Sequence, residues 1–281
     1  MKKTVKVKAP AKINLTLDIL GEEGGYHQLK SLVTTIGIKD TITIKKRKDK
    51  QITLKVKGGN LDCDIQQNNA YKTAVAFQKQ FNTLGVDIVI DKRIPVGGGL
   101  GGSSADISAT LNGMKKLFGI KDSVKPLAEQ LGSDTVYMLD GGLKVISGRG
   151  EKVVSVNSKL KLYLLLITAN ESVSAGGCYK RFDEQGVIYP PSTDLAVKEL
   201  KSGKVDEFLS LLKNDLYPPA KSLVEEIEQN LDLLKPFGTA FMTGSGSVVV
   251  GAYKTKKQLK LAYKTLYPKL KNKLIKTKTF S

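Results

Sequence analysis

Hydrophobic and polar residues alternate in several short stretches of the first half of the chain, as they do in strands with one buried face. Ile13–Ile19 shows this most clearly. A strand there would place Ile13, Leu15, Leu17 and Ile19 on one face and Asn14, Thr16 and Asp18 on the other. The same pattern predicts strands at Thr4–Val7, Thr41–Lys45, Ile52–Val56 and Val86–Ile90, the second and third paired as a hairpin.

Other stretches carry apolar residues three and four positions apart, which predicts helices. Helices are expected at Ala70–Phe81, Ser103–Phe118, Lys125–Leu131, Asp194–Lys201, Val205–Lys213, Ala220–Gln229 and Lys256–Tyr267. Further strands are expected at Gly142–Ile146, Lys152–Val156, Leu162–Ile167, Thr239–Met242 and Val248–Tyr253. Strands and helices mix without a regular βαβ repeat, which favours an α+β fold over a doubly wound α/β fold.

The segment Pro95–Asp106 differs from the rest, because it carries five glycines in six positions. Glycine has no side chain and costs backbone entropy when ordered, so we interpret the run as backbone that closely approaches a ligand. A predicted strand precedes it and a predicted helix follows it. That order places unsatisfied N–H groups and the positive end of a helix dipole at the loop, which predicts an anion site, for example for phosphate. The alternative is a flexible hinge followed by an ordinary serine N-cap.

The loop matches neither of the two common phosphate motifs. No Gly-Lys-Ser/Thr closes it, so it is not a Walker A loop. Gly97, Gly99 and Gly102 have the GxGxxG spacing, but Asp122, the acidic residue about twenty positions on, ends no second strand. Instead the glycines lead into Ser103 and Ser104, whose hydroxyls could cap the helix, bond a phosphate oxygen or hold Mg²⁺.

Composition narrows the class of protein. The formal net charge of +18 invites a nucleic-acid interpretation, but nearly all of the positive charge is lysine, spread along all 281 residues. Phosphate and base recognition favour arginine, so we expect no dedicated nucleic-acid module; the lysines would help to attract a polyanionic small molecule. Cys63 and Cys178 are too few for a disulfide framework, and no apolar run has membrane-spanning length. We expect a cytoplasmic protein.

Three further segments supply what phosphoryl transfer to an alcohol needs: a cation, a carboxylate and a second glycine turn. Lys12 lies at a strand start, Asp134 follows a short helix, and Thr243–Ser247 lies between two strands. Each also has an ordinary explanation, as a surface lysine, a helix-capping carboxylate and a tight hairpin.

Together these segments resemble the GHMP kinase superfamily, and within it the kinases of 4-diphosphocytidyl-2-C-methyl-D-erythritol. The resemblance covers nearly the whole chain. It rests on Ala9–Leu15, on Gly25-Tyr26-His27, on Pro95–Asp106, on Gly148–Glu151, on Asn214–Leu216 and on Met242–Gly246.

The resemblance implies a two-domain GHMP fold with mixed and antiparallel sheets and with the active site in the cleft between the domains. We place an ATP-binding domain at 1–157 and a second domain at 158–281. It implies transfer of phosphate from ATP, with Mg²⁺, to a hydroxyl of the cytidine diphosphate-linked polyol, a step in non-mevalonate isoprenoid precursor biosynthesis. The protein would be a monomer or a homodimer.

The resemblance also assigns site residues. Lys12 and Asp134 match the catalytic pair, and no side chain is assigned to a metal. ATP would be bound by Asn68, Pro95, Gly97, Gly98, Gly99, Leu100, Gly101, Gly102, Ser103 and Ser104. The acceptor would be bound by Asn14, Tyr26, His27, Thr243, Gly244 and Ser245, the histidine acting by stacking; the alternative for His27 is a turn histidine bonded to the backbone.

The sequence departs from that family's usual pattern at Gly24, Ser103, Thr135, Val136 and Ser247. None of these changes removes a catalytic group, but several are expected near the acceptor. A diverged GHMP kinase for another polyol or isoprenoid-precursor alcohol is therefore an alternative. A non-catalytic relative that binds a nucleotide or another anion is a second one, which the retention of Lys12 and Asp134 disfavours.

Overall fold

The computed structural model describes residues 3–58 and 64–280. These divide into two compact units. Unit 1 consists of Met1–Ala11, Ile38–Ile94 and Gly102–Asp140, and unit 2 of Lys12–Gly37, Pro95–Gly101 and Gly141–Ser281. Cys63 lies outside the described residues. The boundary near residue 157 stays a prediction.

Unit 1 contains a sheet in which strand β5 (Val86–Asp91) lies between two other strands. One neighbour is the second half of the long strand β3 (Tyr26–Lys46), antiparallel, with Ile42 opposite Ile90. The other is β4 (Ile52–Lys57), which runs parallel to β5 with Leu54 opposite Ile88. The hairpin expected between β3 and β4 is therefore wrong, because β5 from later in the chain is inserted between them.

Four α-helices belong to the described part of unit 1. They are α1 (Asn69–Phe81), α2 (Gly102–Phe118), α3 (Lys125–Leu131) and α4 (Thr135–Asp140), with a short 3₁₀ turn at Ile65–Gln67 before them. Helix α2 packs against α1 and α4. Helix α2 is buried along most of its length, and its buried residues include small ones such as Ala105, Ser108 and Ala109, which allow neighbouring elements to approach. This packing fixes the start of α2, where the glycine loop ends.

Unit 2 is built around a second, antiparallel set of strands. In it β8 (Tyr163–Ile167) lies between β10 (Val249–Tyr253) and β11 (Leu274–Phe280), and β9 (Thr239–Met242) pairs with the far side of β10. The buried apolar run of β8 was predicted correctly. The first half of β3 pairs with β2 (Asp18–Glu23) and β6 (Lys144–Gly148), and β6 also pairs with β7 (Lys152–Ser155).

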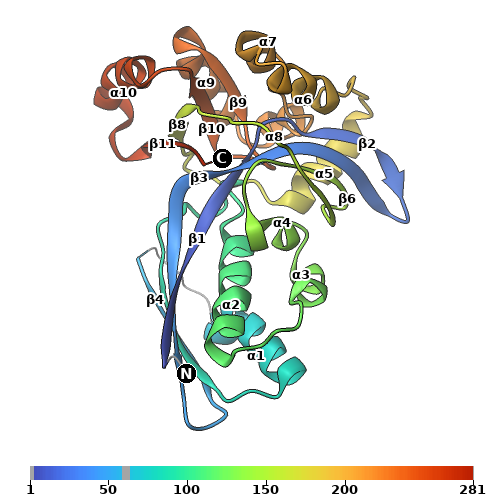
Figure 1. Cartoon of the computed structure of the whole chain (residues 1–281). Helices are drawn as coiled ribbons and strands as arrows, with labels where there is room; N and C mark the ends of the chain where they lie inside the picture. The colour runs from blue at the N-terminus through green and yellow to red at the C-terminus, as the bar shows by residue number, and fades with distance from the viewer. Residues whose placement is uncertain (1–2, 59–63, 281) are drawn as a thin grey trace. The chain divides into compact units, whose positions relative to one another are not determined.

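Six α-helices of unit 2 accompany these strands: α5 (Ala175–Gln185), α6 (Thr193–Lys201), α7 (Val205–Ser210), α8 (Tyr217–Leu223), α9 (Glu226–Leu234) and α10 (Lys256–Leu270). Short 3₁₀ turns cover Lys235–Phe237 and Lys271–Lys273. Helices α9 and α10 pack on β8, β9, β10 and β11 (Figure 1), and their apolar residues form one core with those strands.

Two sequence predictions in unit 2 were wrong in detail. The helix expected at Ala220–Gln229 is two helices, because Val224 is extended and buried between α8 and α9. The strand expected at Ile13–Ile19 is interrupted: β1 (Thr4–Asn14) ends, and β2 begins only at Asp18. Its polar residues do not face solvent, since Asn14, Thr16 and Asp18 are all buried. The mixed α+β class itself is confirmed.

Candidate functional site

The first part of the glycine loop is packed tightly within unit 2. A Cβ atom on Gly97 would lie 2.6 Å from the Cβ of Ser172, and one on Gly98 would lie 2.6 Å from a methyl group of Val248. A Cβ on Gly99 would lie 2.2 Å from the carbonyl oxygen of Thr243. The interpretation of these glycines by ligand approach alone was therefore incomplete, because at least three of them are required by the packing of the chain on itself.

Lys12 and the Thr243 turn share one buried group of side chains with Asn14. The Nζ of Lys12 donates to Oδ1 of Asn14 at 2.5 Å, and the backbone N–H of Asn14 donates to Oγ1 of Thr243 at 2.9 Å. The backbone N–H of Lys12 donates to the carbonyl of Leu100 in the glycine loop at 2.9 Å. The alternative of a surface lysine is thus excluded, since Lys12 is only 5 % exposed. Within unit 2 the structure brings Lys12, Asn14, Thr243 and the loop together.

Hydrogen bonds continue from Asn14 toward the start of α6. The Nδ2 of Asn14 donates to Oγ of Ser31 at 2.8 Å, and this hydroxyl donates to the carbonyl of Thr16 at 2.5 Å. The hydroxyls of Thr16 and Thr193 lie 2.7 Å apart. The orientation of Asn14, and through it of Lys12, is therefore fixed by buried neighbours from β3 and α6.

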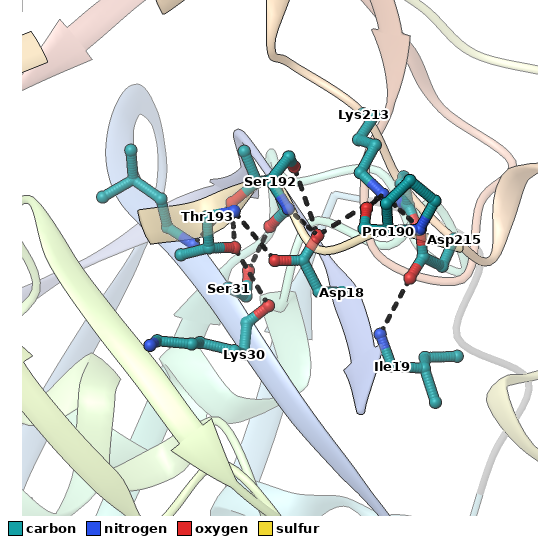
Figure 2. Close-up of polar contacts among 12 residues, drawn as sticks. Asp18, Ile19, Lys30, Ser31, Pro190, Ser192, Thr193, Lys213 and Asp215 are labelled. Carbon is teal, nitrogen blue, oxygen red and sulfur yellow. Dashed lines mark hydrogen bonds and ion pairs between the residues drawn. The ribbon is translucent and has the colours of Figure 1, made fainter. Parts of the chain in front are cut away.

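The same network ends in two buried carboxylates, Asp18 and Asp215, and the partly exposed Lys213 (Figure 2). Asp18 accepts the backbone N–H groups of Ser192 and Thr193 at 2.9 and 2.8 Å, so its carboxylate caps the start of α6. The Nζ of Lys213 lies 3.7 Å from Asp18 and 3.1 Å from Asp215. The sequence analysis missed this role of Asp18, because the alternating pattern placed the residue on the polar face of a strand.

The second part of the glycine loop opens α2 in unit 1. Ser103 and Ser104 lie in the first turn of this 17-residue helix, where the backbone N–H groups have no partners within the helix. Asn69, the first residue of α1, donates a short hydrogen bond from Nδ2 to Oγ of Ser103. Asn68, assigned to ATP from the resemblance, caps α1 by accepting the N–H of Ala70 at 2.9 Å. The starts of α1 and α2 thus lie side by side.

Asp134 lies just before α4, close to the start of α2. A Cβ placed on Gly132 would lie 3.8 Å from Oγ of Ser104 and 2.9 Å from Oγ1 of Thr135. Burial, and after it the charge of Asp134, raise the pKa of the Tyr137 hydroxyl well above its usual range. Within unit 1 the structure therefore places the turn that carries Asp134 beside the serine end of the glycine loop.

Tyr26 and His27 contact aromatic and charged groups of their own unit. The ring of His27 stacks on Tyr179 of α5, with centroids 4.8 Å apart, and its Nε2 lies 2.7 Å from Oδ1 of Asp183. The guanidinium of Arg149 lies over the ring of Tyr26 at 3.6 Å. The alternative of a histidine bonded to the backbone turn receives no support from these contacts. The sequence analysis did not assign Tyr179 or Asp183, because no helix was expected there.

The predicted site residues therefore lie in both units: unit 2 holds the Lys12 group and, separately, Tyr26 and His27, and unit 1 holds Asn68, Ser103, Ser104 and Asp134. Gly244 and Ser245 belong to the Lys12 group, since a Cβ on Gly244 would lie 2.7 Å from the carbonyl oxygen of Gly99. Gly101 ends the loop segment of unit 2, and Gly102 begins the α2 segment of unit 1, so the glycine loop covalently joins the Lys12 group to the group in unit 1.

Comparison with known proteins decides which family carries this arrangement. Two family models match: GHMP kinases N terminal domain over residues 68–142 and GHMP kinases C terminal over residues 196–271. The 4-diphosphocytidyl-2-C-methyl-D-erythritol kinase of Desulfitobacterium hafniense is 36% identical over 265 residues, which are 90% of this chain and 89% of that protein. The protein of that name from Listeria welshimeri is 32% identical over 269 residues, 93% of this chain and 92% of the other. The chain belongs to the GHMP kinase family.

Solved structures share the fold of this chain. The crystal structure of a 4-(cytidine 5'-diphospho)-2C-methyl-D-erythritol kinase superposes with a TM-score of 0.83 at 23% identity, covering 99% of this chain and 100% of the other. L. major mevalonate kinase in complex with R-mevalonate gives a TM-score of 0.78 at 16% identity, covering 99% and 97% of the two chains. These likenesses establish the two-domain GHMP fold.

The described residues of this GHMP kinase also bear on membrane insertion and on metal binding. None of its described helices combines the length and the apolar character needed to span a bilayer. The described residues also contain no group of three or more His, Cys, Asp or Glu side chains that could hold a metal ion.

Proposed function

We propose that this GHMP kinase transfers the terminal phosphoryl group of ATP to a hydroxyl group of 4-diphosphocytidyl-2-C-methyl-D-erythritol. The observation that carries the proposal is the identity of 32–36% over about nine tenths of the chain to proteins that bear the name of this kinase. The net charge of +18 supports it, because both proposed ligands are polyanions.

The glycine loop and the start of α2 are the proposed phosphate site. The unsatisfied N–H groups of the first helical turn and the positive end of the helix dipole favour an anion there. The partly exposed hydroxyl of Ser104 and the exposed one of Ser103 can add hydrogen bonds to phosphate oxygens. Asn68 and Asn69, at the start of α1, would border the same nucleotide, since Asn69 already contacts Ser103.

Asp134 and Lys12 are the proposed catalytic residues. The acceptor oxygen forms a bond to the γ-phosphorus while the bond from that phosphorus to the β–γ bridging oxygen breaks, so that ADP leaves. In this proposal Asp134 accepts the hydroxyl proton, and the Lys12 ammonium polarises the hydroxyl. The proposal gives Asn14 two tasks, because it orients Lys12 and also lies among the residues assigned to the acceptor.

Magnesium is proposed to enter together with ATP. This ion usually keeps several waters and binds through the substrate phosphates and one or two protein oxygens, so it does not need a cage of protein carboxylates. Ser104 has the hydroxyl chemistry to hold it from the protein side. When bound, magnesium would neutralise charge on the phosphates.

The aromatic group of unit 2 is the proposed site for the cytidine part of the acceptor. Tyr26 is half exposed and its ring is covered on one face by Arg149, while His27 is stacked on Tyr179. A pyrimidine has two faces for stacking and an edge for hydrogen bonds, and base–aromatic stacking contributes about 1–3 kcal/mol. Thr243, Gly244 and Ser245 would border the polyol end.

Formation of ADP tests this proposal. Purified protein with ATP and Mg²⁺ is offered the cytidine substrate, mevalonate, homoserine or no acceptor, and ADP is measured by a coupled assay. Turnover with the cytidine substrate alone is the expected result. Turnover with another alcohol only would favour the diverged kinase, and nucleotide binding without turnover on any acceptor would favour the non-catalytic relative.

A further inference from the structure

Three charged side chains of unit 1 meet in a buried cluster beside the start of α2. The Nζ of Lys92, next after β5, lies 2.7 Å from Oδ2 of Asp40 and 2.7 Å from Oδ2 of Asp106. Asp40 belongs to β3 and Asp106 to α2. The side chains of Lys92 and Asp106 are each 9 % exposed, and that of Asp40 is fully buried. Neither the phosphate site nor the catalytic pair proposed above includes any of them.

The cluster holds both ends of the glycine loop. On the entry side, Oδ1 of Asp40 accepts the backbone N–H groups of Arg93 and Ile94 at 2.5 and 2.8 Å, and Ile94 directly precedes Pro95. On the exit side, Asp106 lies one helical turn after Gly102. A Cβ on Gly102 would lie 3.1 Å from a methyl group of Ile94 and 3.6 Å from Nζ of Lys92. The two ends of the loop are therefore in contact. The Nζ of Lys92 bridges Asp40, which holds the entry, and Asp106, which lies at the exit.

Stability alone does not account for this arrangement. Burying charges costs solvation, and apolar residues of similar volume often give equal or greater stability than a buried ion pair. Here one cation faces two carboxylates, and the second oxygen of Asp106, Oδ1, is buried without a hydrogen-bond partner. Burial raises the pKa of Asp106 to about 7, although Lys92 acts in the opposite direction. Such perturbed groups concentrate at functional sites.

We propose that Lys92 and Asp106 are positioning residues that fix the exit of the glycine loop in the arrangement that binds ATP. The inference rests on the proposed function, because it assigns the loop to the nucleotide. Asp40 fixes the entry through two backbone N–H groups, and the Lys92–Asp106 hydrogen bond ties the first turn of α2 to it. Without that bond the loop samples other arrangements, and the apparent affinity falls in proportion to the population that remains competent.

A pair of substitutions at Asp106 tests this. Asp106→Ala removes the tether and leaves Lys92 paired one-to-one with Asp40, so the remaining cluster is neutral. Asp106→Asn is the matched variant, because its amide oxygen can still accept from Lys92. If the loop is competent about a tenth of the time, Asp106→Ala raises the dissociation constant for ATP about tenfold. The turnover number at saturating ATP stays close to that of the wild type, and Asp106→Asn binds ATP normally.

The outcomes separate positioning from simple stabilisation. Unfolding temperatures are measured for both variants, and binding is measured well below them by calorimetry with ATP and Mg²⁺. Normal ATP affinity in a folded Asp106→Ala protein would overturn the inference, as would equal weakening in Asp106→Asn. If Asp106→Ala does not fold, Lys92→Arg serves instead. The larger guanidinium group in the same cluster should change the affinity for ATP without changing the KM for the acceptor. An unchanged affinity for ATP overturns the proposal. Failure of the wild type to bind ATP would count against the proposed function itself.

Discussion

Replacing Gly99 by alanine probes the contact between the glycine loop and the Thr243 turn. Gly99 has φ +74°, in the left-handed region, and a Cβ there would lie 2.2 Å from the carbonyl oxygen of Thr243. The left-handed conformation costs an alanine about 1–2 kcal/mol. Relieving the clash requires the loop and the turn to separate by about 1 Å, since carbon contacts are comfortable only at about 3.5 Å.

Gly119 provides a matched control for this substitution. It has φ +71° and no atom within 4 Å of its Cβ position, so Gly119→Ala incurs the conformational cost without a clash. It follows the far end of α2, about 25 Å from Gly102 by helical rise. The difference between the two variants therefore isolates the effect of moving the loop.

We expect Gly119→Ala to lower the free energy of unfolding by about 1–2 kcal/mol and to leave ATP binding unchanged. Gly99→Ala should destabilise more and should also weaken ATP binding by roughly ten- to a hundredfold, which corresponds to a binding-competent loop population of about a tenth to a hundredth. Unfolding is followed by denaturant titration and binding by calorimetry. Equal ATP affinity in the two folded variants would refute the argument that the Thr243 turn holds the loop in its binding form.

Four further predictions concern the proposed catalytic pair, His27, Cys178 and Asp106. Asp134→Asn should lower the turnover number by about 10²–10⁴-fold and keep its affinity for ATP, and Lys12→Met should act similarly. The double variant should lose less activity than the product of the two single losses. Asp122→Asn, at an exposed turn, is the control and should have the wild-type turnover number in steady-state kinetics. His27→Ala should raise the KM for the cytidine substrate about five- to a hundredfold and leave that for ATP unchanged, and an unaltered KM would reject this contact. Burial raises the pKa of Cys178 to about 12, so peptide mass mapping should find this thiol unmodified by iodoacetamide at pH 8 in the folded protein and modified in urea. Burial raises the pKa of Asp106 from 3.8 to about 7, so the stability that the protonated group gives at low pH is lost as the pH rises from about 4 to about 7. Asp106→Asn should therefore gain stability relative to wild type across that range and level off above it, and parallel pH curves would contradict this.

The local patterns predicted elements well where the spacing of apolar residues is regular. The period of α2 and the alternation of β5 came directly from the sequence, and both flank the glycine loop. Pairing could not be predicted in the same way, because nothing local says that β5 is inserted between β3 and β4. Helix α5 was missed because Gly176 and Gly177 in its first turn lower its helical propensity.

The glycine cluster of the candidate site is conspicuous in the sequence, whereas Lys12 and Asp134 were assigned only through the family resemblance and stay predictions. The residues that support the candidate site could not be predicted in this way. Asn14 and Asp18 looked like the solvent face of a strand, yet they are buried and satisfied by Ser31 and by the start of α6. Those partners lie far along the sequence, so only the folded chain reveals them.

The most direct measurement of the central claim is the mass of the reaction product. The wild-type protein is incubated with ATP, Mg²⁺ and 4-diphosphocytidyl-2-C-methyl-D-erythritol, and the acceptor is analysed by mass spectrometry, with the Asp134→Asn variant in parallel. The account predicts an acceptor heavier by one phosphoryl group, with the cytidine diphosphate intact, in an amount equal to the ADP formed and greatly reduced in the variant. An acceptor of unchanged mass after ATP has been bound would contradict it.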